Sequence, residues 1–220
     1  MANDILNKVI EQLKPKNVTL VAVSKTKPNE VILEMYNEGQ RVFGENKVQE
    51  LTAKYEALPK DIQWHAIGHL QTNKVKYIAP FITMIHSIDS LKLLKEVNKR
   101  AKQNDRTIDC LLQMHIAEEE SKFGLDKQEV KAILDSEVYQ NFQNIRIVGV
   151  MGMATFTDDN QQVRQEFQNL KSIFDNLKST YFNHQDSFKE ISMGMSGDYE
   201  LAIEEGSTMV RIGSLLFGKR

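Results

Sequence analysis

The fold is read most directly from the stretch Leu20-Val21-Ala22-Val23-Ser24-Lys25-Thr26-Lys27-Pro28. A short run of small and apolar residues that ends before a proline predicts a strand buried on both faces. Lys25 would then lie at the carboxyl end of this strand, half inside the protein. A lysine in that place either extends its ammonium group to solvent or has a chemical role, because a desolvated amine has a lowered pKa and can form a Schiff base with an aldehyde. This stretch alone favours the first of these two alternatives.

Similar apolar runs recur along the chain and alternate with amphipathic segments. We expect strands at residues 18–24, 41–44, 63–68, 82–87, 107–116, 145–151, 190–193 and 208–212. We expect helices at residues 3–14, 28–37, 46–57, 72–79, 90–102, 127–141 and 198–205. The clearest helical spacing lies between the sixth and seventh strands, at Val163, Phe167, Leu170, Phe174 and Leu177.

Strands that alternate with helices indicate a parallel sheet with right-handed crossovers. Eight such strands in 220 residues favour a closed (β/α)8 barrel of the TIM type over an open sheet. The predicted fold class is therefore α/β, with the helix at residues 3–14 as an extra element before the barrel. No linker or low-complexity segment divides the sequence, so we expect residues 1–220 to form a single domain.

The composition excludes several classes of partner. A net charge of −2 provides no electrostatic reason to expect binding to nucleic acid or to an anionic membrane. The single cysteine, Cys110, excludes an internal disulfide framework, fits a reducing cytosol and reads as a small buried hydrophobic residue. The N-terminus has no secretory signal, and the longest largely apolar stretch, residues 147–156, is too short to span a bilayer. We therefore expect a soluble cytoplasmic protein.

In a barrel of this kind, functional groups come from the carboxyl ends of the strands. Those positions hold Lys25 and Asn46 in the first half of the chain, and small residues after the seventh and eighth strands, at 194–197 and 213–214. Such small residues either form ordinary turns or leave backbone N–H groups open to an anion. Arg211 ends the eighth strand, and its charge requires either an acid such as Asp198 or a ligand.

The histidines do not predict a metal site. His65 and His69 are four residues apart, but they straddle a strand end and so lack the helical geometry of a zinc-binding pair. A phosphorylated aldehyde would use the other candidate groups together: the lysine for an imine, the small residues for phosphate and the polar groups for a ring. Pyridoxal 5'-phosphate (PLP) has this shape.

Seven motifs in order along the chain resemble those of the pyridoxal phosphate homeostasis protein family. They are AVSKTKP (22–28), FGENKVQE (43–50), WHAIGHLQTNK (64–74), SKFGL (121–125), GVMGMA (149–154), MGMSGDY (193–199) and VRIGSLLFG (210–218). The resemblance implies a single-domain barrel similar to the N-terminal domain of alanine racemase. Ala66 departs from the family pattern, in which a larger residue is expected, and this is a change in packing.

The resemblance also implies roles for individual residues. Lys25 would form the Schiff base with PLP, and Asn46 would lie beside the cofactor. Arg211 would face the pyridine nitrogen, and the phosphate would be held by Ser196, Gly213 and Ser214. Lys27 and Lys122 lie near the predicted barrel mouth, either as secondary contacts for cofactor or phosphate or as solvated surface lysines.

Two functions follow from this resemblance. The first is a carrier that holds PLP as a Schiff base and acts in intracellular PLP homeostasis without catalysis, with PLP-dependent apoenzymes as candidate recipients. The alternative is a PLP-dependent amino-acid racemase, which needs an acid or base on each face of the cofactor. Lys25 serves one face, and Tyr199 is the nearest candidate for the other, although it reads more simply as a helix-start residue. A third reading is a barrel enzyme that uses Lys25 without a bound cofactor.

The end of the sequence favours the carrier. Alanine racemases carry a second, β-rich domain that supplies a catalytic tyrosine, and this sequence ends at Arg220, directly after the eighth-strand motif. We therefore expect no catalytic residue, no metal and a monomer.

Overall fold

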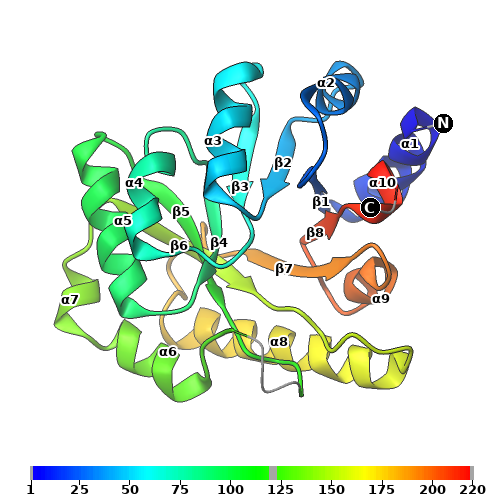
Figure 1. Ribbon diagram of the computed structural model, residues 1–220. Helices are drawn as coiled ribbons and strands as arrows, with labels where there is room; N and C mark the ends of the chain where they lie inside the picture. Colours follow the sequence, from blue (N-terminus) through cyan, green and yellow to red (C-terminus); the bar gives the residue numbers. More distant parts are fainter. Residues whose placement is uncertain (1, 119–122, 219–220) are drawn as a thin grey trace.

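Eight parallel strands form the frame of the protein in a computed structural model that describes residues 2–118 and 123–218. They are β1 (Thr19–Val23), β2 (Val42–Glu45), β3 (Gln63–Ala66), β4 (Met84–Ile88), β5 (Ile108–Gln113), β6 (Ile145–Met151), β7 (Glu190–Met195) and β8 (Met209–Ile212). The strands pair in chain order, and β1 also pairs with β8, so the sheet closes into a barrel (Figure 1). The predicted (β/α)8 fold is confirmed.

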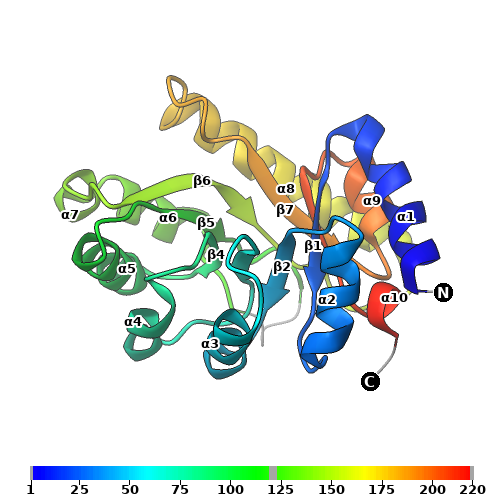
Figure 2. The same ribbon diagram turned by 90° about the horizontal axis from the view of Figure 1, so that it is seen from above.

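Helices follow the strands and surround the barrel, as Figures 1 and 2 show from two directions. They are α1 (Ala2–Leu13), η1 (Lys14–Lys16), α2 (Asn29–Asn37), α3 (Val48–Ala57), η2 (Thr72–Lys74), α4 (Val75–Ile78), α5 (Leu91–Gln103), α6 (Lys127–Leu134), α7 (Glu137–Gln140), α8 (Asn160–Thr180), α9 (Tyr199–Glu204) and α10 (Ser214–Phe217). The extra N-terminal helix, α1, lies beside α10, so the two described ends of the chain are neighbours. None of these helices, within the residues described, is long and apolar enough to cross a lipid bilayer.

Three helical elements differ from the prediction. The helix expected at residues 72–79 is the 3-10 turn η2 followed by α4. The single helix expected at residues 127–141 is broken into α6 and α7, because Ser136 begins a new helix and its hydroxyl accepts the N–H of Tyr139 at 3.2 Å. The short helix α10 was not expected, because four residues are too few to show a helical period.

Strand residues alternate between the helix-covered outside of the barrel and its interior. On β1, Leu20 and Ala22 belong to the large cluster that packs against the helices, whereas Val21 belongs to a small interior cluster. The interior cluster consists of Val21, Met84, Leu111, Val148, Met151 and Met209. It fills part of the barrel below the carboxyl ends of the strands and leaves those ends as the floor of a cavity.

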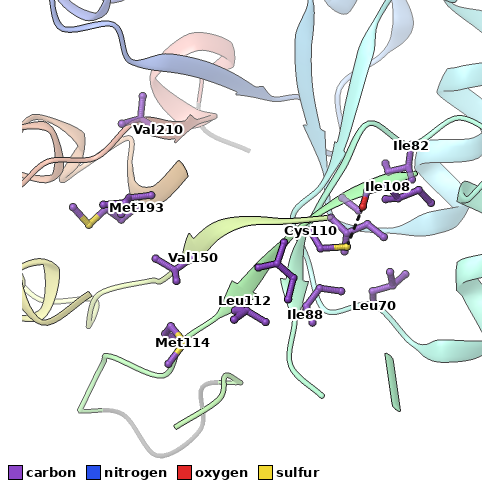
Figure 3. Packing of buried hydrophobic residues seen from close by; sticks show 14 of the residues in the cluster. Leu70, Ile82, Ile88, Ile108, Cys110, Leu112, Met114, Val150, Met193 and Val210 are labelled. Atoms are coloured by element: carbon purple, nitrogen blue, oxygen red, sulfur yellow. Dashed lines mark hydrogen bonds between the residues drawn. The ribbon is translucent and has the colours of Figure 1, made fainter. Parts of the chain in front are cut away.

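Cys110 belongs to the outer layer of this packing. Figure 3 shows it among apolar side chains such as Ile82, Ile108 and Leu112, with its Sγ 3.7 Å from the carbonyl oxygen of Ile108. The thiol is fully buried, and burial raises its pKa. Its position agrees with the prediction of a small buried hydrophobic residue.

Candidate functional site

A cavity of about 680 Å³ opens at the carboxyl ends of the strands. This volume falls within the range of roughly 300–1,000 Å³ that is typical of small-molecule sites. All six of the candidate cofactor residues line it, namely Lys25, Asn46, Ser196, Arg211, Gly213 and Ser214. Lys122 and Ser121 of the sequence motifs lie outside the described residues.

Lys25 follows β1 and is half-buried at the cavity wall. The chain turns here, because the N–H of Lys27 donates to the carbonyl oxygen of Ser24 at 3.0 Å. Lys27 also lines the cavity, but its ammonium donates to the carbonyl oxygen of Phe217 at 2.7 Å. The side chain of Lys27 thus ties the first strand loop to α10 near the end of the described chain.

Asn46 follows β2, and its backbone rests against Gly68 at the end of β3. A Cβ built on Gly68 would lie 2.7 Å from the carbonyl oxygen of Asn46 and 2.9 Å from its Cα. Such distances are shorter than van der Waals contact, so only glycine allows this approach. The position of Asn46 at the cavity therefore depends on a residue of the next strand loop.

Small residues after β7 and β8 form one end of the cavity. The hydroxyl oxygen of Ser196 accepts the N–H groups of Gly213 at 3.1 Å and Leu215 at 3.3 Å, so the two loops are joined. A Cβ built on Gly197 would have no protein atom within 4 Å, which means that its missing side chain leaves open space in the cavity wall. Open space beside the Ser196 hydroxyl and the small residues at 213–214 leaves room for an anion such as a phosphate group.

Arg211 of β8 points into the barrel and is only 4% exposed. Its guanidinium donates to the hydroxyl of Ser192 at 2.6 Å and to the carbonyl oxygen of Gly152 at 3.0 Å. Burial lowers the pKa of Arg211 to about 10, and the carboxylate of Asp198 opposes this shift. Arg211 therefore remains charged at neutral pH and reaches the cavity as a fixed donor.

Behind Arg211, a chain of buried polar groups crosses the barrel interior. The Ser192 hydroxyl lies 3.0 Å from Nδ1 of His86, and Nε2 of His86 lies 2.9 Å from Nδ1 of His65. Since a guanidinium can only donate, the Ser192 oxygen accepts from Arg211 and its O–H donates to Nδ1 of His86, whose Nε2–H then donates to Nδ1 of His65. We call Arg211, Ser192, His86 and His65 the interior chain.

Both histidines of the interior chain are neutral at pH 7. Burial lowers the pKa of His65 to about 3. Burial, His65 and the positive charge of Arg211 also hold the pKa of His86 well below its ordinary value. The interior chain thus carries one positive charge, on Arg211 at the cavity.

The sequence did not indicate the interior chain or its role. Its members lie on different strands, and only the alternation of inward and outward positions along each strand could have placed them together. His69 is not part of the interior chain: it is exposed, lines the cavity, and its Nδ1 is 3.1 Å from a carboxylate oxygen of Asp89. Within residues 2–118 and 123–218, no group of three or more acidic, histidine or cysteine side chains gathers to hold a metal ion.

The residues present fit PLP. An amine, a permanent donor for a ring nitrogen and a cradle of small and hydroxyl-bearing residues suit the aldehyde, the pyridine ring and the phosphate of this cofactor. Val23, Ile67 and Met153 supply apolar walls to the same cavity. The arrangement can therefore bind, orient and partly shield a flat phosphorylated aldehyde.

Comparisons of the sequence with known proteins point to one family. A family model described as alanine racemase, N-terminal domain, matches residues 6–220. The pyridoxal phosphate homeostasis protein of Aquifex aeolicus (strain VF5) is 43% identical over 202 residues, which cover 91% of this chain and 86% of that protein. The pyridoxal phosphate homeostasis protein of Homo sapiens is 40% identical over 211 residues, which cover 91% of this chain and 76% of that protein.

Two solved structures extend the comparison. PipY of Synechococcus elongatus PCC7942, solved with PLP bound, superposes with a TM-score of 0.89 at 34% identity and covers 99% of this chain and 100% of its own. Alanine racemase from Bartonella henselae has a TM-score of 0.74 at 15% identity, with 100% of this chain and 62% of that chain covered, and so shares the fold. From the cavity, the family model and these relatives, we conclude that the chain belongs to the alanine racemase N-terminal domain family and, within it, to the pyridoxal phosphate homeostasis proteins.

Proposed function

We propose that this protein binds PLP in the cavity at the carboxyl ends of the strands and acts in PLP homeostasis as a carrier rather than as a catalyst. The single observation that carries the proposal is the convergence of all six candidate residues on one cavity. Relatives named for this role, and one solved with PLP bound, support it.

Each residue has a distinct task in this proposal. The Lys25 amine attaches the aldehyde carbon of the cofactor as a Schiff base, and Asn46 packs beside the ring. Ser196, Gly213 and Ser214 hold the phosphate through hydroxyl and N–H groups. When bound, PLP supplies a reactive aldehyde and a ring that can delocalise electrons.

Arg211 supports carriage over most amino-acid chemistry. A positively charged donor beside the pyridine nitrogen disfavours protonation of that nitrogen, because like charges repel. The ring is then a weak electron sink, so the site holds PLP without strongly activating an amino acid. Ser192 and Gly152 keep Arg211 in this orientation.

A racemase would need a second acid or base opposite Lys25. Tyr199 begins α9, as the sequence suggested, and its hydroxyl donates to the side-chain oxygen of Gln12 at 2.8 Å. Tyr199 is absent from the described residues that line the cavity. This arrangement favours the carrier, although Lys25 alone could exchange a proton slowly.

The test is direct. Purified protein mixed with PLP should gain visible absorbance, and borohydride reduction followed by peptide mass spectrometry should find the cofactor on Lys25. Lys25→Ala should abolish both signals, whereas Lys60→Ala, on the exposed surface, should retain them. A colourless wild type, or labelling at another lysine, would refute the proposal. Turnover of L-amino acids in deuterated water at about 1 per second or faster would identify an enzyme instead.

We further propose that the chain works as a single domain, as a monomer and in the cytoplasm, and that it passes PLP to PLP-dependent apoenzymes. One closed barrel contains the eight described strands, which supports the single domain. The buried thiol of Cys110 fits a reducing compartment. Sedimentation analysis of the holo form, and transfer of PLP to a purified apoenzyme, would test the monomer and the carriage.

A further inference from the structure

Lys25 lies in a turn whose backbone is strained. The turn runs from Ser24 to Lys27, and Thr26 at its third position has a φ of +66°. Glycine or asparagine usually occupies a third position with positive φ, and a β-branched residue there is an outlier. The preferences of these four residues therefore do not explain the turn, and some contact from outside must hold it.

That contact comes from helix α3. The ammonium of Lys54 donates to the carbonyl oxygen of Ser24 at 2.8 Å, to Oε1 of Glu45 at 2.7 Å and to Oε1 of Glu50 at 2.6 Å. Glu50 Oε1 also accepts the N–H of Thr26 at 2.6 Å. The peptide groups on either side of Lys25 are thus both held by side chains of α3, in a set of contacts that we call the α3 clamp.

The α3 clamp lies almost entirely inside the protein. The Lys54 side chain is 5% exposed and the Glu45 side chain is fully buried, whereas Glu50 is 24% exposed. The hydroxyl of Ser24 donates to Glu45 Oε1 at 2.6 Å, which adds a further fixed contact. Buried ion pairs contribute little net stability, because removing the charges from water costs about as much as their attraction returns. The clamp is better explained by what it positions.

We infer that Glu50 and Lys54 are positioning residues that hold Lys25 in a strained turn, from which its amine meets the cofactor. Neither of them lines the cavity beside Arg211, so they act through the backbone of Lys25. This inference rests on the proposed role of Lys25 as the attachment point. If the positive φ of Thr26 is the source of the strain, the clamp should become dispensable when residue 26 is glycine.

The experiment exploits that dependence. Glu50→Ala removes the acceptor of the Thr26 N–H at a partly exposed site, and Glu56→Ala, an exposed position of the same helix, is the matched control. Timed borohydride trapping of PLP on Lys25 should be slowed about tenfold by Glu50→Ala and unchanged by Glu56→Ala. Adding Thr26→Gly to Glu50→Ala should restore most of the rate, because glycine adopts positive φ without strain.

A second readout needs no cofactor. Amide hydrogen exchange at Thr26, followed by NMR, should become several-fold faster in Glu50→Ala and stay as in wild type in Glu56→Ala. Trapping at the wild-type rate in Glu50→Ala would overturn the inference while leaving Lys25 as the attachment point. A slowed rate that Thr26→Gly does not restore would mean that Glu50 is merely structural. Failure of wild-type protein to trap PLP on Lys25 would overturn the proposed function as well.

Discussion

Replacing Ser192 by alanine tests whether the interior chain holds Arg211. The Ser192 hydroxyl is fully buried and contacts two groups, the Arg211 guanidinium at 2.6 Å and His86 Nδ1 at 3.0 Å. Hydrogen bonds to charged groups contribute about 1.5–3 kcal/mol, and the hydrogen bond to the neutral His86 adds roughly 0.5–1 kcal/mol. We expect Ser192→Ala to lower the free energy of unfolding by about 2–4 kcal/mol.

Ser207 provides a matched control. It is also a buried serine, and it precedes β8, but its hydroxyl faces the backbone carbonyl oxygens of Ile191, Met193 and Met209. One hydroxyl proton can satisfy one of these neutral acceptors at a time, so Ser207→Ala should cost only about 1 kcal/mol. The difference between the two variants isolates the charged contact.

Urea unfolding and thermal unfolding of both variants, each followed by circular dichroism, measure this difference in free energy and in melting temperature. For a chain of this size, Ser192→Ala should lower the melting temperature by roughly 4–16 °C and Ser207→Ala by about 2–4 °C. Ser192→Ala should also weaken PLP retention, because Arg211 loses one of its two fixed partners. Equal costs for the two serines would refute the reasoning that the interior chain stabilises a buried charge.

Three further outcomes follow. Burial lowers the pKa of His65 to about 3, so the unfolded chain takes up a proton below pH 6.5 that the folded protein does not bind. This residue alone should make the protein about 2 kcal/mol less stable at pH 5 than at pH 7, as measured by urea titration. Equal stability at the two pH values would contradict this prediction. Gly68→Ala should lower the free energy of unfolding by about 1–3 kcal/mol, because the added Cβ pushes Asn46 away. Gly197→Ala should change the free energy of unfolding by less than about 0.5 kcal/mol and weaken PLP binding in equilibrium dialysis. Cys110 should react with a thiol reagent only when the protein unfolds, and rapid labelling of the native protein would exclude its burial.

The sequence predicted the strands and the cavity-facing candidates well, because both depend on local patterns. A buried strand is a short apolar run, and in a barrel its carboxyl end is fixed by topology. Once the strands are counted, Lys25, Asn46 and Arg211 fall at the same end of the barrel, where they line one cavity. Their convergence required no knowledge of side-chain contacts.

The contacts behind the site could not be predicted in the same way. Neighbouring members of the interior chain are separated by at least 19 residues in sequence, and their pairing depends on strand register. Lys54 lies four residues after Glu50 on a predicted helix, and this spacing is a usable signal of an ion pair. Whether such a pair turns inward is decided by packing that a single sequence does not display.

The pairing of β1 with β8 has a consequence for how the protein is made. Lys25 follows one side of this junction and the small residues of the cradle follow the other, so the cavity forms only after the last strand has left the ribosome and closed the ring. A molecule that bridges the junction binds the closed ring and not an open one. At a concentration one hundred times its dissociation constant, it would stabilise closure by about 2.7 kcal/mol. A cofactor bound across this junction would therefore shift the newly made chain towards its closed form.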